Sequence, residues 1–148
     1  MAGKLHKHPQ RKLEFPALTH LNHSVTSAQS LLYNCFAYAM GDVNRQWRPD
    51  PMGLYYWPPA ARRETTIGAM EEMLGSFGYR PTESRRIENG VEKVAVFVKN
   101  NAVTHFAKQL SDGKWTSKLG DAEDIKHVLD ALNGPQYGAV ARIYSRPL

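Results

Sequence analysis

The sequence predicts an α+β domain in which helices come first and a small antiparallel sheet follows. Apolar residues at helical spacing mark two helices in the first half of the chain. β-Branched and apolar runs, separated by short turn signals, fill residues 92–119. This segregation of helices from strands is typical of α+β folds and not of alternating α/β folds.

The two predicted helices follow an approach segment over residues 15–33. The first runs over about 34–40, with Asn34 as its N-cap and Gly41 as the residue that ends it. The second runs over 65–77, where apolar residues recur at helical spacing. The apolar positions of this second helix are Ile67, Met70, Met73, Leu74 and Phe77.

The second half of the chain predicts strands, a late helix and a final strand. Three strands are expected over 92–98, 104–110 and 114–119, and turn residues separate them. A helix is expected over 122–132, because its apolar residues fall on one face. These apolar residues are Ile125, Val128, Leu129 and Leu132. A last strand is expected over 137–144.

Length and composition indicate one globular domain over residues 15–148. The chain has 148 residues, of which 42% are hydrophobic, enough to bury a core of its own. No apolar run approaches the ~20 residues of a membrane span, and the basic N-terminus lacks the apolar segment of a secretory signal. The single cysteine excludes an internal disulfide and a cysteine-rich zinc site. We therefore expect a cytoplasmic protein, or one exported without a signal peptide, with no metal and no cofactor. The oligomeric state stays open.

Basic side chains crowd the N-terminus of a chain whose net charge is +5. Residues 1–14 predict a disordered basic arm. Its basic and imidazole side chains are Lys4, His6, Lys7, His8, Arg11 and Lys12. Such an arm could contact nucleic acid, but no nucleic-acid motif accompanies it, so nucleic-acid association ranks last among the functions considered.

Residues 42–60 predict a long loop, because four prolines interrupt them and aromatic residues lie between. A loop of this length often serves as a wall or lid over a cleft. The equal alternative is a loop whose aromatic side chains simply pack on the core. The candidate cleft residues are Trp47, Tyr56 and Trp57, with Trp115 and Lys118 from a predicted strand.

Cys35, the only cysteine, is placed by this prediction at the start of a helix. The helix dipole and unpaired N–H groups there would stabilise a thiolate and could bind an oxyanion. His105 follows at the start of a predicted strand, and a cysteine at a helix start with a later strand histidine is the skeleton of a cysteine hydrolase. The alternative is that Cys35 is an inert packed residue.

The residue that would orient His105 depends on the turn that follows its strand. A three-residue loop at 111–113 puts Ser117 on the face that carries His105. A two-residue turn would put Thr116 and Lys118 there instead. The sequence leaves both registers open.

Further polar residues are candidates for supporting roles. Asp121 and Asp124 follow the third predicted strand and are charged alternatives for orienting a histidine. Gln29 and Asn34 lie before or beside the cysteine, and either amide could donate an N–H to an oxyanion.

Four motifs resemble those of an uncharacterised, mostly bacterial domain family. They are residues 34–39 (NCFAYA), 57–58 (WP), 104–110 (THFAKQL) and 113–120 (GKWTSKLG). The resemblance spans about residues 30–146. More distantly, the layout is similar to the papain-like superfamily, and within it to NlpC-type and CHAP-type amidases and endopeptidases.

The papain-like resemblance implies N-terminal helices, with a cysteine at a helix start, packed on a small antiparallel sheet. It maps the nucleophile onto Cys35, the base onto His105 and the third residue onto Ser117. That third residue is usually His, Asn or Asp in the superfamily. The oxyanion glutamine of papain lies six residues before its cysteine, as Gln29 does here.

Residues and resemblance together predict a small thiol hydrolase, peptidase-like or amidase-like, acting on an amide bond of a peptide or protein substrate. Cys35 would attack, His105 would take and return the proton, and Ser117 would orient His105. The alternative from another class is a non-catalytic papain-like binding module, or an interaction protein, whose partner surface is the Pro/aromatic loop.

Overall fold

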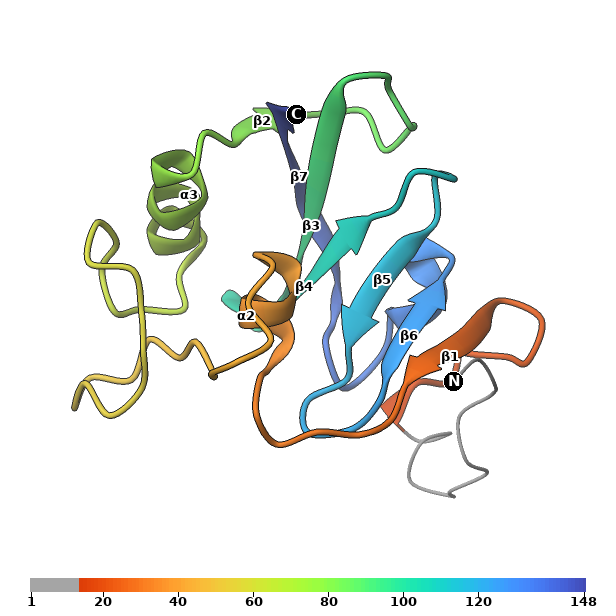
Figure 1. Ribbon diagram of the computed structural model, residues 1–148, viewed down its shortest axis with the longest axis horizontal. Coiled ribbons are helices and arrows are strands. Elements are labelled where there is room, and N and C mark those ends of the chain that lie inside the picture. The colour runs from red at the N-terminus through yellow and green to blue at the C-terminus, as the bar shows by residue number, and fades with distance from the viewer. Residues whose placement is uncertain (1–13) are drawn as a thin grey trace.

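The computed structural model describes residues 14–148 and consists mainly of one seven-stranded antiparallel sheet (Figure 1). The strands are β1 (His23–Ser27), β2 (Arg80–Thr82), β3 (Val91–Lys99), β4 (Ala102–Gln109), β5 (Trp115–Lys118), β6 (Asp124–His127) and β7 (Ala139–Pro147). Their order across the sheet is β1-β6-β5-β4-β3-β7-β2, so short strands form both edges. The predicted basic arm lies almost entirely outside the described residues.

The fold is predominantly β, so the predicted papain-like α+β class is wrong. Within residues 14–148, only α3 (Ile67–Ser76) is a helix of several turns, whereas α2 (Cys35–Ala39) is a little more than one turn long. Both helices were predicted close to these bounds. The prediction missed β1 and β2 and placed a helix over 122–132, where β6 lies, so it understated the strand content.

The helix predicted over 122–132 is replaced by β6 and a short 3-10 helix, η1 (Leu129–Leu132). Ile125 pairs with Ser117 across β5 and β6, and it alternates with charged neighbours as a strand residue does. Apolar spacing at 125, 129 and 132 fits both a helix and this strand followed by a turn. The pairing with β5 decides between them, and sequence periodicity does not report such pairing.

The approach segment and the first residues after α3 hold the two edge strands that the sequence did not predict. β1 is mostly polar and pairs only with β6, and β2 is three residues long and contains Pro81. Polar residues and proline are the usual composition of an edge strand, and they remove the alternating signal that predicts a strand.

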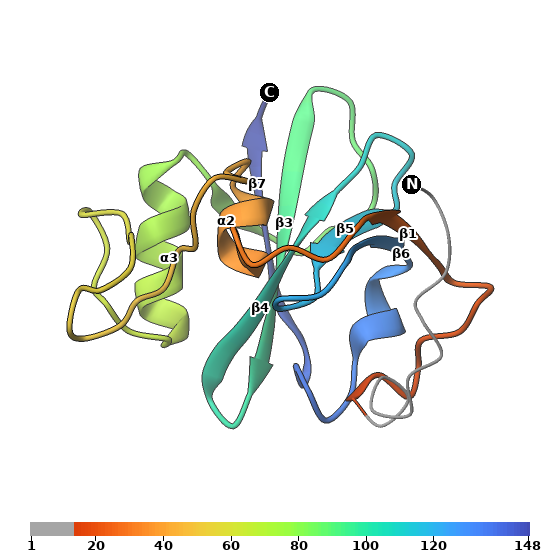
Figure 2. The same ribbon diagram turned by 60° about the horizontal axis from the view of Figure 1, so that its bottom comes forward.

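Two hydrophobic cores lie on opposite faces of the sheet (Figure 2). The first lies between the sheet and the helices α2 and α3, and Phe106 of β4 belongs to it. The second lies beneath η1 and the N-terminal segment, and Ala107 of β4 belongs to it. Successive strand residues point to opposite faces, so each position along β4 is assigned to one core or the other.

The β4–β5 hairpin has the three-residue loop, which the sequence left as one of two options. Gln109 pairs with Trp115, and the Leu110 N–H donates to the carbonyl of Lys114 over 2.7 Å. Gly113 has a φ of +88°, the left-handed conformation that such a loop requires. This register puts Ser117 on the same face of the sheet as His105.

Candidate functional site

Cys35 is the first residue of α2 and packs into the core between that helix and the sheet. Its exposed fraction is 7%. Burial raises the pKa of the thiol to about 11, although the backbone N–H of Phe106 opposes the rise. This direction is opposite to the lowering expected at a helix start, because desolvation of a thiolate outweighs the dipole of a five-residue helix.

His105 is fully buried on the other face of the sheet. Its ring stacks on Tyr137 with centroids 4.1 Å apart and lies edge-on to Phe97 at 5.2 Å. Neither ring nitrogen has a hydrogen-bond partner within residues 14–148. Burial, and then the charge of His127, holds the pKa of His105 well below its usual range, so the imidazole is neutral at pH 7.

The sheet itself separates the predicted nucleophile from the predicted base. Phe106, next in sequence to His105, packs edge-on to Phe36 of α2 with centroids 4.8 Å apart. Cys35 belongs to that same core, whereas the ring partners of His105 belong to the opposite core. A base must reach its nucleophile within hydrogen-bond distance. This structure does not bring Cys35 and His105 together as a dyad.

Ser117 shares a face with His105, but its hydroxyl forms a hydrogen bond with a different histidine, His127. The Ser117 hydroxyl lies 2.7 Å from Nε2 of His127, and Nδ1 of His127 lies 2.7 Å from the carbonyl of Val128. A proton on Nδ1 satisfies both contacts, which leaves Nε2 to accept from Ser117. Both side chains are fully buried. The sequence analysis predicted a helix over 122–132, so it did not predict this pair between β5 and β6.

The two amides proposed for the oxyanion have different surroundings. Asn34 is the N-cap of α2, and its Oδ1 accepts from the N–H groups of Ala37 and Trp47. Its Nδ2 donates to the carbonyl of Trp47 over 2.7 Å, so this amide ties the helix to the following loop. Gln29 is exposed in the segment between β1 and α2.

The aromatic cleft candidates mostly pack inward. Trp47 and Trp57 are buried with α2, and Trp115 is buried in the opposite core. Tyr56 is half-buried against Trp47, with the guanidinium of Arg45 3.5 Å above its ring. Trp47, Tyr56 and Trp57 therefore form the base of the loop, and the aromatic candidates do not line one cleft together.

Lys118 is fully buried on the α2 side of the sheet, and its ammonium donates to the carbonyls of Ser30 and Ala122. Its neighbour across the strands is Asp124, whose Oδ2 accepts from Ser27 and Tyr33 over 2.5 Å each. Burial and the Asp124 hydrogen bond raise the pKa of Tyr33 to about 12. This network joins β1, β5, β6 and the approach to α2. The sequence analysis named both charged residues but did not predict that they lie opposite each other on β5 and β6.

The loop between α2 and α3 is held in shape by a clamp that the sequence analysis missed. The Asp50 carboxylate accepts from the backbone N–H groups of Leu54, at 2.6 Å, and Tyr55, at 3.1 Å. Arg63 donates to Asp50 Oδ1 and to the Tyr55 carbonyl, each over 3.0 Å. An Asp-Pro pair followed by glycine, as at residues 50–53, is a signal for such a turn.

This clamp presents apolar side chains to solvent at the tip of the loop. Met52 is 81% exposed, Leu54 79% and Tyr55 44%. The loop extends beyond α3, away from the sheet (Figure 1). The guanidinium of Arg48 lies 5.3 Å from the centroid of the Tyr55 ring and adds positive charge beside the tip.

Neither a metal centre nor a membrane span is found in the part of the chain that the structure describes. No cluster of three or more His, Cys, Asp or Glu side chains there is arranged to hold a metal ion. No helix within residues 14–148 has the length and apolar character needed to cross a membrane.

Comparison with protein families gave one match, a domain of unknown function (DUF7689), which covers residues 24–145. Neither the curated proteins nor the solved structures gave a match. The matched segment contains every strand of the sheet except the ends of β1 and β7, together with both helices. The expected membership of an uncharacterised domain family is thus confirmed, and the chain belongs to the DUF7689 family.

Proposed function

We propose that the protein is a protein-interaction module that binds its partner through the tip of the α2–α3 loop. The observation that carries the proposal is the clamp of Asp50 and Arg63, which holds three apolar side chains in solvent. Two hydrogen bonds and an ion pair stabilise a turn whose side chains make little contact with the core. A fold does not need such an arrangement for its own stability, whereas a binding surface does.

Preorganisation is what makes this tip suited to binding. Ordering a flexible loop on association costs free energy for each side chain and backbone unit that becomes fixed. Here the backbone of Leu54 and Tyr55 is already fixed by Asp50, and Trp47 anchors the base of the loop to Asn34. Most of the ordering cost is therefore met by the folding of the domain.

The chemistry of the tip indicates the partner surface. Methionine adapts to irregular apolar pockets, and tyrosine is enriched among residues that dominate binding energy. Met52 and Leu54 would enter an apolar pocket, while Arg48 and Tyr55 would contact its rim. Because Arg48 adds positive charge beside the apolar tip, the complementary surface is an apolar pocket with an acidic rim.

The thiol-hydrolase alternative has weaker geometric support. Cys35 and His105 pack into different cores, and burial shifts the pKa of each in the direction opposed to catalysis at pH 7. An amidase acting on a peptide substrate stays a prediction from the sequence, as do a cytoplasmic location and bacterial occurrence of the family. The binding proposal needs neither Cys35 nor His105.

Site-specific photocrosslinking tests the proposal. A benzophenone amino acid in place of Met52 should give one discrete adduct in an extract of the source cells, and Leu54→Ser should abolish it. The matched control carries the probe at Leu21, which is 86% exposed just before β1. The same adduct from both positions, or an adduct indifferent to Leu54→Ser, would overturn the proposal. Titration of the partner so identified should show binding weakened at least tenfold by Leu54→Ser.

A further inference from the structure

The open edge of β7 forms a second binding site, and we propose that it takes an extended peptide that alternates acidic and apolar residues. The peptide would add to the sheet as a further strand beside β7, in line with β2. The mode of binding is β-strand addition, in which backbone hydrogen bonds give affinity and alternate side chains give specificity. This site is independent of the loop tip.

The edge is open because β2 covers only part of β7. β2 has three residues, and they pair with Ile143, Tyr144 and Ser145 of the nine-residue β7. The preceding part of β7, residues 139–142, pairs with β3 on one side. On its other side no strand within residues 14–148 pairs with it. Unpaired backbone groups of an edge strand are a template for another chain.

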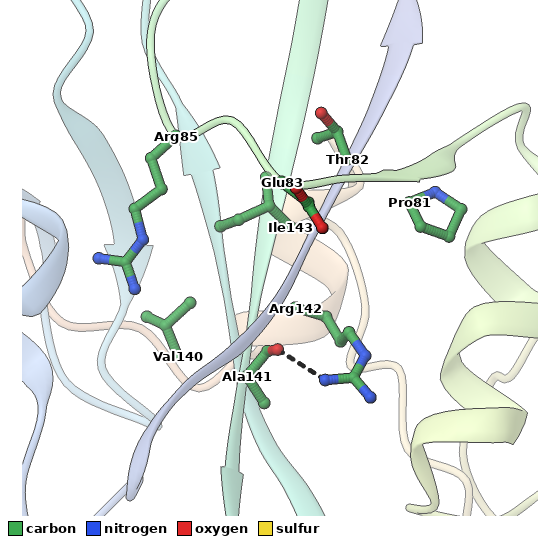
Figure 3. A pocket seen from close by; sticks show the side chains of 8 residues that line it. All are labelled: Pro81, Thr82, Glu83, Arg85, Val140, Ala141, Arg142 and Ile143. Atoms are coloured by element: carbon green, nitrogen blue, oxygen red, sulfur yellow. Dashed lines mark hydrogen bonds between the residues drawn. The ribbon is translucent and has the colours of Figure 1, made fainter.

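A groove lies along this uncovered stretch (Figure 3). Its volume is about 690 Å³, within the roughly 300–1,000 Å³ typical of ligand sites. Pro81, Thr82, Glu83 and Arg85 line one side, and residues 140–143 of β7 line the other. The groove thus begins where β2 ends, and a strand placed in it would continue the line of β2.

The two sides of β7 in the groove differ in chemistry. Val140 and Ile143 belong to the apolar core beneath η1, whereas Arg142 is exposed and points to the opposite side of the strand in Figure 3. The pairing of β7 with β3 shifts by one residue at Ala141, because Val96 pairs with Arg142 and the next residue, Phe97, pairs with Val140. This extra residue in β7 lets Val140 and Ile143 share one face. The bound peptide itself would send successive side chains to opposite faces. A peptide of alternating character would therefore place carboxylates toward Arg142 and apolar side chains toward Val140 and Ile143.

Arg142 is available to such a peptide. Its Nη1 donates to the carbonyl of Ala141 over 2.9 Å, a contact that a peptide N–H could replace. The freed guanidinium could then bind a carboxylate in bidentate geometry. Arg85, across the groove, already contacts both carboxylate oxygens of Asp130 at 2.9 and 3.1 Å. The acidic contacts of the peptide are therefore assigned to Arg142.

The test uses a fluorescein-labelled seven-residue peptide that alternates glutamate and valine, measured by anisotropy and by amide shifts of the full chain in NMR. The proposal expects saturable binding with the largest shifts over residues 139–142. Arg142→Glu should weaken binding at least tenfold, and Arg142→Ala should weaken it less. Arg86→Glu, the matched control in the turn after β2, should leave binding unchanged, as should Leu54→Ser.

Two further peptides separate strand addition from simple charge attraction. A peptide methylated on alternate backbone nitrogens keeps its charge but loses the N–H donors at those nitrogens. It should bind at least tenfold more weakly. A lysine and valine peptide should not bind. Equal binding of the methylated peptide, or equal weakening by Arg142→Glu and Arg86→Glu, would overturn the proposal. If no amide shifts appear over residues 139–142, the edge binds no peptide and the proposal is overturned.

Discussion

The two faces of the sheet bury their polar side chains in different ways. On the α2 face, Asp124 and Lys118 are joined to hydroxyl and carbonyl groups in a network that spans several elements. On the opposite face, His105 is buried between aromatic rings without a hydrogen-bond partner within residues 14–148. The first arrangement gives hydrogen bonds to the Lys118 ammonium and to Oδ2 of Asp124, and the second keeps an imidazole by holding it neutral. The difference shows that neither face combines an activated thiol with a working base.

The largest effect on stability is expected from breaking the network on the α2 face. Asp124→Ala would leave the hydroxyls of Ser27 and Tyr33 without their acceptor, and it would remove a negative charge near the buried ammonium of Lys118. Each buried polar group left without its partner costs about 1–3 kcal/mol, so the two hydroxyls together predict a loss of about 2–6 kcal/mol. Urea unfolding at pH 7 measures the loss. Asp121→Ala, at an exposed position in the same turn, is the control and should change stability by less than about 0.5 kcal/mol.

The buried histidines on the opposite face of the sheet predict a loss of stability in acid. Burial lowers the pKa of His127 to about 4, whereas an unfolded histidine has a pKa of about 6.5. Since the unfolded chain binds more protons in this window, stability is full above pH 6.5 and falls as the pH drops toward 4, by about 3 kcal/mol for this residue. Burial lowers the pKa of His105 in the same direction. Urea unfolding from pH 7.5 to 4.5 should show the decline, and a flat profile would contradict the buried, neutral histidines.

A smaller effect at neutral pH distinguishes the two histidines from each other. His105→Leu removes ring nitrogens that have no partner within residues 14–148, at similar volume, so stability should change by less than about 1.5 kcal/mol. His127→Leu, the matched comparison, leaves the buried Ser117 hydroxyl unpaired and should cost about 1–3 kcal/mol more. Equal losses would mean that His105 has an essential polar partner. Thermal and urea unfolding of both variants at pH 7.5 makes the comparison.

The smallest effect on stability is expected at the loop tip. Met52→Ser and Leu54→Ser alter exposed side chains, so each should change the free energy of unfolding by less than about 0.5 kcal/mol. Asp50→Ala removes the acceptor of two backbone N–H groups and of Arg63, and should loosen the loop without unfolding the sheet. Hydrogen exchange at Leu54 and Tyr55 should then accelerate, while exchange in β3 and β4 stays unchanged.

Much of the local structure was predictable because its signals lie within a few residues of each other. The cap at Asn34, the apolar spacing of α3 and the β-branched run of β3 each depend on local sequence, and all three are present. The three-residue hairpin loop was one of two registers that the sequence allowed. Edge strand β2 and strand β6 depend on pairing with distant strands, and local sequence does not encode such pairing.

The candidate site was less predictable, because it depends on which face of β4 each residue occupies. Cys35 and His105 were identified as chemically capable. Their pairing was inferred from the order of a helix-start cysteine and a later strand histidine, and from a resemblance to papain-like proteins that the fold does not support. In β4 the residue that reaches the Cys35 side is Phe106, one position beyond His105. A shift of one residue in a strand moves a side chain to the other face, and no local sequence pattern reports that register relative to α2.

The most direct test of the central claim is the rate of Cys35 alkylation by iodoacetamide against pH, in the wild type and in His105→Leu. The separation of the two residues by the sheet predicts slow alkylation of the folded protein. It also predicts a thiol pKa raised toward about 11, with the same profile in both proteins. A thiolate that titrates below the ~8.5 of a free thiol, and whose pKa rises when His105 is replaced, would contradict the account and restore the thiol hydrolase.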